Sequence, residues 1–473
     1  MKRACLDAIK NSNESRLVGT SSIRHLKNKL VRIKEKKLLL SVLFICLTLQ
    51  TFASGGADSS MQFSLEQAKQ YALENSPLVK SAALDLEAAK KKIWETTAIG
   101  LPQASAKYSY SYILTLPEIY KQFAQMGGGG EANLDDMKSS STLDITVSQL
   151  LFSGAYLVGL QTSRVYKGLS ELSLTKSKND LNESVTNAYL LVLIAKENKK
   201  ILDTMYNNMN ALLETIKAMN SKGFVEETDV DQFQITVNTV KNNLELVTNQ
   251  VLIAERMLKY QLGYPFESAI TLTDSINGFV NNININTILA EPFQVENNVD
   301  YKLVETQTKL MKLNLKLNKS EFLPDIAAFY QHDKNFNDKA VSFTPPDLVG
   351  LTINIPIFSS GQRLAKVSQA RISYEKAKIS QDQTAKGLKI QFEDNKAKYI
   401  NALGNYESSK SNYALAEKIY NRSITKYKAG MISSSDLTQV QNQYLQAQTN
   451  YFSAILDLTS AKSKIENLIS TVK

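Results

Sequence analysis

The stretch LTINIPIF, residues 351–358, decides how the rest of this chain must be arranged. Its apolar side chains fall on every second position, which is the period of a half-buried strand. The period changes after Gly361, because residues 362–427 contain no proline and repeat Ala, Lys, Leu, Gln and Glu at helical spacing. The sequence therefore predicts a short strand that leads into a helix of about 65 residues, roughly 100 Å long. A helix of that length suits a sheet continued by a helical tube better than it suits a compact domain.

The same strand, helix, turn and helix occur earlier in the chain. The segment 152–154 precedes another long helical run, which stops before residue 223 and resumes after residue 229. Three pairs of landmarks share one offset of 207 positions: Gly154 with Gly361, Gly223 with Gly430, and Asp229 with Asp436. A repeat of this size predicts a fold built from two copies of one unit.

Residues 1–53 differ in charge from everything that follows them. They hold eleven Lys and Arg against three acidic residues, whereas residues 54–473 hold 44 against 43. The formal charge of +9 therefore belongs to this leader. The remainder lacks the basic domain that a nucleic-acid-binding protein needs, so we expect no nucleic-acid partner.

The leader has the pattern of a secretory signal peptide. A basic region is followed by an apolar run over 38–49 and by small residues for cleavage at 51–53. The apolar run is about 12 residues long, which is too short for a stable membrane anchor. Ile45 before Cys46 makes a poor lipoprotein site, so we expect no lipid anchor. Both cysteines of the chain lie in the leader, so the mature protein has no disulfide or thiol chemistry.

Each half contains two runs of alternating residues that predict long strands. On the first run, Tyr108, Tyr110 and Tyr112 share the apolar face, which makes them candidates for an interfacial aromatic girdle. Ordinary packing against lipid or another subunit is the alternative. Such runs are long enough to cross a bilayer obliquely. The four runs cover 103–115, 141–152, 324–332 and 348–358.

These observations divide the chain into four parts. Pro356 lies near the end of the last strand, where a proline is tolerated, and Gly154 and Gly361 mark the two junctions between strand and helix. Each half also contains a helical hairpin. The parts are a leader (1–53), a first repeat (54–264) with a hairpin tip near 223–229, a connecting segment (265–292) and a second repeat (293–473) with a tip near 430–436.

Four membrane-length strands in one chain cannot close a barrel. Left alone, they would present two unpaired edges to lipid, where each orphan backbone group costs several kcal/mol. We therefore expect several copies to share one barrel, and three copies would supply twelve strands. The long helices are polar over much of their surface, which suits a tube wetted on both sides.

The junctions and turns resemble those of the TolC-like outer-membrane efflux protein family. The resemblance rests on Gly154, on IPIFSSG at 355–361, and on the paired turns Gly223-x5-Asp229 and Gly430-x5-Asp436. It covers residues 62–470. The resemblance implies a mixed but mainly α-helical homotrimer, with a shared 12-stranded barrel in the outer membrane of a Gram-negative bacterium and a helical barrel in the periplasm. It also implies an exit duct for efflux or type I secretion, served by a periplasmic adaptor and an inner-membrane pump.

The same resemblance implies that the hairpin tips form the periplasmic gate. Asp436 matches a carboxylate that rings the constriction, where three copies would favour cations and raise the pKa of some members. Capping of a helix N-terminus is the alternative role for this side chain. Gln439 stands where many relatives carry a second acid. Tyr427 and Asp229 match a pair that ties inner to outer helices, although Tyr427 could equally be an ordinary packed tyrosine.

The glycines of the tips have a structural interpretation and a functional one. Gly223 and Gly430 are expected to supply positive φ at helix ends. In the family this region also contacts the adaptor, so both turns are candidate docking positions.

The inventory of reactive residues argues against an enzyme. His332 is the only histidine after the leader, and no set of ligands has the spacing of a metal site. The glycine run at 127–130 lacks the Lys-Ser/Thr of a phosphate-binding loop, so it predicts an exposed loop. We therefore expect no cofactor, no metal and no catalytic residues.

Two other classes of protein compete with the channel. A soluble periplasmic coiled-coil scaffold or adaptor would account for the helices but not for four membrane-length strands. A secreted enzyme is third, and the missing catalytic set speaks against it.

Overall fold

A computed structural model of the chain describes residues 61–115, 117–118, 138–276, 278, 293–336 and 345–470. The signal peptide expected at 1–53, the glycine run at 127–130 and most of the segment expected to connect the halves lie outside these residues. By internal contacts the chain divides into residues 1–61 and 62–473, and the architecture below is that of the second unit.

Long helices make up most of this unit, and they come in pairs of equal length. α5 and α10 have 67 residues each, α6 and α11 have 36 each, and α3 and α9 have 22 each. The helices are α2 (Leu65–Asn75), α3 (Pro77–Ala98), α5 (Gly154–Asn220), α6 (Glu227–Leu262), α9 (Val299–Ser320), α10 (Gln362–Lys428) and α11 (Ser434–Ile469), and a 3-10 turn, η1 (Val295–Asn297), precedes α9. Among the described residues, no helix is both long enough and apolar enough to span a membrane.

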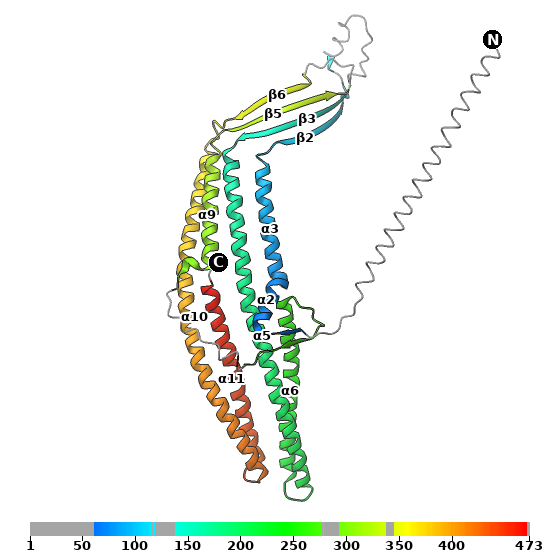
Figure 1. The fold of residues 1–473 in the computed structure, drawn as a ribbon, viewed down its shortest axis with the longest axis vertical. Helices are drawn as coiled ribbons and strands as arrows, with labels where there is room; N and C mark the ends of the chain where they lie inside the picture. The colour runs from blue at the N-terminus through cyan, green and yellow to red at the C-terminus, as the bar shows by residue number, and fades with distance from the viewer. Residues whose placement is uncertain are drawn as a thin grey trace, which may run out of the picture. The chain divides into compact units, whose positions relative to one another are not determined.

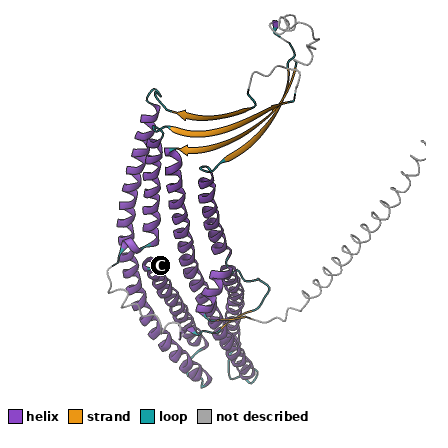
Figure 2. Ribbon diagram, turned by 45° about the horizontal axis from the view of Figure 1, so that its top comes forward, coloured by secondary structure: helices purple, strands orange, loops and turns teal. Residues whose placement is uncertain are grey.

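Four antiparallel strands form one curved sheet at one end of the helices (Figures 1 and 2). Their order is β2-β3-β5-β6, so β2 and β6 are open edges. The strands are β2 (Gln103–Tyr112), β3 (Ser139–Phe152), β5 (Asp325–Asn335) and β6 (Asp347–Asn354). A second, two-stranded sheet pairs β1 (Met61–Phe63) with β4 (Ile270–Leu272).

The register places apolar residues on one face across the sheet. Tyr330 of β5 lies opposite both Val147 of β3 and Val349 of β6, and Tyr108 of β2 lies opposite Leu143. Neighbouring positions on the other face are polar, as at the pair formed by residues 107 and 144. Val349 is 78% exposed, so none of the described residues covers this part of the apolar face.

Phe329 interrupts the alternation of β5, and the structure shows where its ring goes. It lies against Gly350 on the adjacent strand, where a Cβ atom would come within 2.5 Å of the ring. Glycine on β6 therefore makes room for an aromatic side chain on the otherwise polar face.

The two strand-to-helix junctions use glycine for different reasons. A Cβ on Gly154 would lie 2.8 Å from Leu323, so close approach of the chain to the end of α9 requires glycine there. Gly361 has open space around it but adopts a φ of +81° at the start of α10. β6 ends at Asn354, so Pro356 lies beyond the strand and leaves the ladder of hydrogen bonds intact.

From the sheet, α3, α5, α9 and α10 run side by side, and α5–α6 and α10–α11 form two hairpins at the far end (Figure 1). The first hairpin buries aliphatic side chains, among them Leu213 and Val240. The second is built differently. It contains a tyrosine ladder, whose members are Tyr406, Tyr413 and Tyr420 of α10 with Tyr444 and Tyr451 of α11.

The ladder depends on a seven-residue spacing of tyrosines in both helices. Tyr413 stacks on Tyr451 with ring centroids 5.2 Å apart, and Tyr420 stacks on Tyr444 at 5.1 Å. Burial raises the pKa of Tyr420 to about 12, so the hydroxyl stays protonated at neutral pH. Offset aromatic pairs contribute about 0.5–1.5 kcal/mol each beyond area burial, so α10 and α11 are held together along several turns.

Candidate functional site

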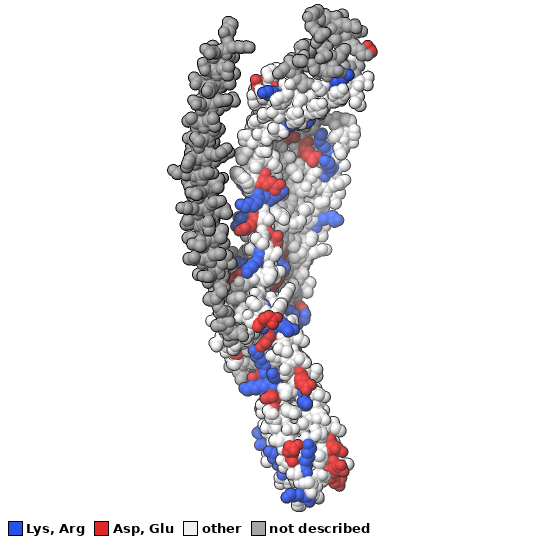
Figure 3. Space-filling model, turned by 90° about the vertical axis from the view of Figure 1, so that its right-hand side faces the viewer, with Lys and Arg blue, Asp and Glu red and all other residues white. Residues whose placement is uncertain are grey.

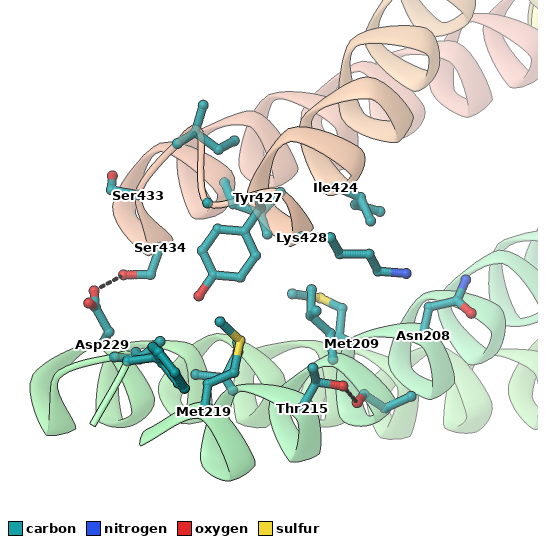
Figure 4. Close-up of a pocket in the computed structure, with 18 of the residues that line it drawn as sticks. Asn208, Met209, Thr215, Met219, Asp229, Ile424, Tyr427, Lys428, Ser433 and Ser434 are labelled. Carbon is teal, nitrogen blue, oxygen red and sulfur yellow. Dashed lines mark hydrogen bonds between the residues drawn. The ribbon is translucent and has the colours of Figure 1, made fainter. Parts of the chain in front are cut away.

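The two hairpin tips lie next to each other and enclose a cavity of about 790 Å³ (Figure 4). Its walls combine apolar side chains such as Met209 and Met219 of α5 with polar ones such as Asp229 and Ser434. Because α5 and α6 form one side and α10 and α11 the other, the cavity exists only while the hairpins stay together.

The turns at the two tips have equivalent geometry. Gly223 and Gly430 adopt φ values of +78° and +69°, so both predicted positive φ angles are present. The next residue in each turn is a large apolar one that faces solvent: Phe224 is 77% exposed and Met431 is 73% exposed. Each tip therefore ends in an exposed apolar side chain.

Asp436 caps the start of α11. Its backbone N–H donates to Ser433 Oγ at 3.1 Å, and the backbone N–H of Ser433 donates to Asp436 Oδ2 at 3.1 Å, which completes a capping box. The Ser433 hydroxyl also donates to Asp436 Oδ2, at 2.8 Å. Hydrogen bonds from Ser433 lower the pKa of Asp436. The ionised form therefore supports the helix start at neutral pH, and this support is lost as the pH falls through the lowered pKa. The capping role considered for Asp436 is thus present, and its carboxylate is exposed.

Asp229 occupies the matching position at the start of α6 and has a different partner. The N-cap residue here is Glu226, which makes no side-chain cap. Glu226 and Asp229 therefore form no capping box, in contrast to Ser433 and Asp436. Asp229 Oδ1 instead accepts a hydrogen bond of 2.7 Å from the hydroxyl of Ser434, on the other hairpin (Figure 4).

Tyr427 lies in the same cavity as Asp229. Its ring stacks on Phe233 of α6, with centroids 5.8 Å apart and an interplanar angle of 6°. Burial, followed by the charge of Asp229, raises the pKa of the Tyr427 hydroxyl. The structure therefore brings the expected pair together, but the hydrogen bond that Asp229 accepts across the tips comes from Ser434.

Further polar contacts continue from Ser434 along α11, and we call this line of contacts the seam. Thr236 and Thr438 hydroxyls lie 3.0 Å apart, and Gln448 donates to Asn198 Oδ1 of α5 at 2.9 Å. Gln441 is also buried in α11, and its Oε1 has no hydrogen-bond partner. The seam therefore adds neutral polar contacts to an apolar cluster that both hairpins share, with Leu213 from the first hairpin and Leu437 from the second among its buried members.

Sequence reasoning missed the seam. Ser434, Thr438, Gln441 and Gln448 recur at helical spacing among the apolar residues of α11, and this polar stripe was the available signal. Gln439, the expected second member of the gate, is exposed one position from the stripe.

The other predicted positions lie at the opposite end of the unit. Gly154, Gly361 and Pro356 form the junctions with the sheet, and the tyrosines at 108, 110 and 112 are exposed on β2. His332 pairs with Asp347 at 2.8 Å on neighbouring strands. In the part of the chain that the structure describes, no group of His, Cys, Asp and Glu has the arrangement of a metal site.

Comparisons with known proteins agree with this architecture. The family model "outer membrane efflux protein" matches residues 69–264 and 296–471. The proteases secretion protein PrtF of Dickeya chrysanthemi is 20% identical over 361 residues, which are 74% of this chain and 76% of that protein. Similar folds occur in the CmeC outer membrane channel of Campylobacter jejuni (TM-score 0.68, 15% identity, 86% of this chain and 85% of that one) and in VceC of Vibrio cholerae (TM-score 0.66, 15% identity, 86% and 96%).

Two adjacent serines give a direct test of the site. We expect Ser433→Ala to weaken only the start of α11, by about 1 kcal/mol, because it removes a cap. We expect Ser434→Ala to loosen both α11 and α6, because Asp229 then loses its donor from the other hairpin. Hydrogen–deuterium exchange distinguishes them: Ser433→Ala should speed exchange at 433–438 alone, and Ser434→Ala should also speed it at 227–233. Equal exchange at 227–233 in both variants would contradict the assignment.

Proposed function

Because this chain belongs to the outer membrane efflux protein family, we propose that three copies of it form the outer-membrane exit duct of an efflux or type I secretion system. The family match confirms the resemblance inferred from the junctions and turns. The family and the similar solved structures are channels rather than enzymes. Membership also implies an adaptor and an inner-membrane pump as partners. The leader at 1–53 directs the export that this location requires.

The open sheet is the observation that carries the proposal. β2 and β6 have unpaired edges, and the face that contains Tyr108, Tyr330 and Val349 is apolar and uncovered. In lipid an apolar face is favoured, but an open edge is not. Three copies, each pairing its β2 with the β6 of the next, make a closed barrel of twelve strands and satisfy both requirements.

The helices also have surfaces that another copy would cover. On α10, Ile372 and Ile379 are exposed at a spacing of seven residues, and on α6 Leu246, Ile253 and Tyr260 are exposed at the same spacing. A seven-residue apolar spacing is typical of helices that pack along a partner. In the proposed trimer these stripes meet neighbouring copies, and the helical part forms a tube in the periplasm.

Two structural repeats make up each copy in this proposal. The equal lengths of α5 and α10, of α6 and α11, and of α3 and α9 support it. The match of the family model to both halves supports it as well. The repeats are residues 54–264 and 293–473, joined by the segment 265–292.

The hairpin tips are the gate of the duct in this proposal. Asp436 and Gln439 ring the constriction, while Asp229, Ser434 and Tyr427 hold the two hairpins together when the gate is closed. The turns at Gly223 and Gly430 dock the adaptor with the exposed apolar side chain that follows each glycine. Opening separates the hairpins along the seam, which water can then hydrate.

Native mass spectrometry in detergent tests the assembly, and planar bilayers test the duct. We expect a trimer of the mature chain, and we expect the trimer to conduct ions when it is reconstituted. A soluble coiled-coil adaptor would extract in buffer without detergent. A detergent-soluble monomer with no conductance would overturn the proposal.

Crosslinking the seam should hold the gate closed. In the double variant T236C/T438C, the two sulfur atoms replace hydroxyls that lie 3.0 Å apart. The mature chain has no other cysteine, so the disulfide is unambiguous. We expect low conductance after oxidation and recovery on reduction, while either single variant behaves like the wild type. An oxidised double variant that conducts as well as the reduced one would exclude the seam as the opening surface.

Asp436 should set the ion selectivity of the constriction. In D436N the ring loses its negative charge, so we expect the preference for cations to fall. The measurement is the reversal potential in a KCl gradient, with D457N as a control, since Asp457 is exposed on the same helix but 21 positions from the tip residue. An unchanged reversal potential in D436N would leave Asp436 with its capping role alone.

A further inference from the structure

Positive charge is concentrated on the helix segments that adjoin the sheet. The segments 86–98, 154–168, 307–321 and 362–376 hold thirteen Lys and Arg against four Glu. The rest of residues 54–473 holds 31 Lys and Arg against 39 Asp and Glu. On the face drawn in Figure 3, basic and acidic side chains are intermixed along the helices, as in a solvated wall. The excess near the sheet therefore does not follow from the average composition.

α9 shows the clearest arrangement of this charge. Four lysines are exposed at a spacing of three, four and three residues, which places them on one face of the helix. We call them the lysine stripe: Lys309, Lys312, Lys316 and Lys319. The flank of α9 that carries Gln307 and Asn314 has no Lys or Arg, and the acidic Asp300 and Glu321 lie at its two ends. The helix thus carries its positive charge on one side only.

The acidic residues nearby are engaged mainly with cations outside the stripe. Glu95 pairs with Lys92 at 2.7 Å, Glu321 with Lys366 at 3.1 Å, and Glu375 with Lys378 at 3.2 Å. Within the stripe, Lys309 pairs with Glu305 at 2.9 Å. Glu87, the remaining acid of the four segments, lies on α3. In the part of the chain that the structure describes, none of these ion pairs includes Lys312, Lys316 or Lys319.

The stripe lies at a defined distance from the sheet. Lys319 is the next-to-last residue of α9, and Lys309 is ten residues earlier, or about 15 Å along the helix axis. β5 starts five residues after α9 ends. If the sheet spans the membrane, the stripe lies where phospholipid headgroups meet water, and basic side chains at that level attract anionic lipids.

We propose that the lysine stripe binds anionic phospholipid headgroups of the leaflet next to the helical barrel. This proposal rests on the proposed membrane-spanning role of the sheet. The ammonium groups nearest the sheet contact lipid phosphate, and the others attract the same anionic surface from the water beside it. The binding falls with ionic strength, because the contacts are electrostatic and partly exposed to water.

A tryptophan placed in the stripe reports which lipid lies beside it. The chain has one tryptophan, so W94F/K319W has a single reporter at the end of α9 nearest the sheet. The trimer is reconstituted in vesicles of phosphatidylcholine and phosphatidylglycerol, with one of the two lipids brominated to quench the fluorescence. We expect brominated phosphatidylglycerol to quench the reporter at least twice as strongly as brominated phosphatidylcholine at equal mole fraction.

Charge removal then tests the stripe itself. When K309Q/K312Q/K316Q is added to W94F/K319W, we expect the two brominated lipids to quench equally. The control set K199Q/K200Q/K418Q removes three exposed lysines far from the sheet, and it should leave the preference for phosphatidylglycerol intact. High salt should likewise make quenching by the two brominated lipids equal.

The outcomes separate this inference from the function. Equal quenching by both lipids in the W94F/K319W protein would overturn the lipid preference and leave the duct unaffected. No quenching by either lipid, in a trimer that conducts, would place the stripe toward the lumen and overturn the inference. Loss of both the trimer and the conductance would overturn the proposed function itself.

Discussion

Pairing of the backbone at the edges of the four-stranded sheet is the constraint on which the rest of the structure depends. A strand edge in water is solvated, but in lipid each unpaired N–H and C=O costs several kcal/mol. The chain supplies two edges, β2 and β6, and an apolar face that none of its described residues covers. Association of identical copies removes both edges by closing the sheet. Closure of the barrel then fixes where the helices begin around its rim, since four of them adjoin the four strands directly.

Below the sheet, the two halves of the chain have similar shapes but different interiors. The α5–α6 hairpin is held by aliphatic side chains, and the α10–α11 hairpin is held by stacked tyrosines. Between the hairpins lie hydroxyl and amide groups, and Gln441 and Gln448 each have a buried oxygen without a partner. A buried, unsatisfied oxygen costs about 1–3 kcal/mol, which is recovered when water reaches it. These polar groups lie beside an apolar cluster to which both hairpins contribute.

Duplication explains why equivalent residues act differently. Asp229 and Asp436 occupy the same position after the turn, but the residues three and two positions before each differ in kind: Glu226 and Glu227 in one repeat, Ser433 and Ser434 in the other. Ser433 engages its aspartate within one helix turn, so Asp436 stabilises α11. Glu226 has no hydroxyl to donate, so Asp229 accepts from Ser434, 205 positions away. Two serines in place of two glutamates therefore supply both the cap that involves Asp436 and the donor that reaches Asp229 from the other hairpin.

The sequence by itself determined the long helices, the alternating strands and the family, because these depend on local period and on motifs that recur at one offset. It also placed the glycines of both tips, since positive φ is a local demand. Only the tertiary structure decided two other features. It shows which donor reaches Asp229, and it shows that Tyr444 and Tyr451 lie between the tyrosines of α10. The seven-residue spacing of those tyrosines was visible in the sequence, but stacking depends on the register between two antiparallel helices. Such a register is set by packing over the whole hairpin, and no local pattern encodes it.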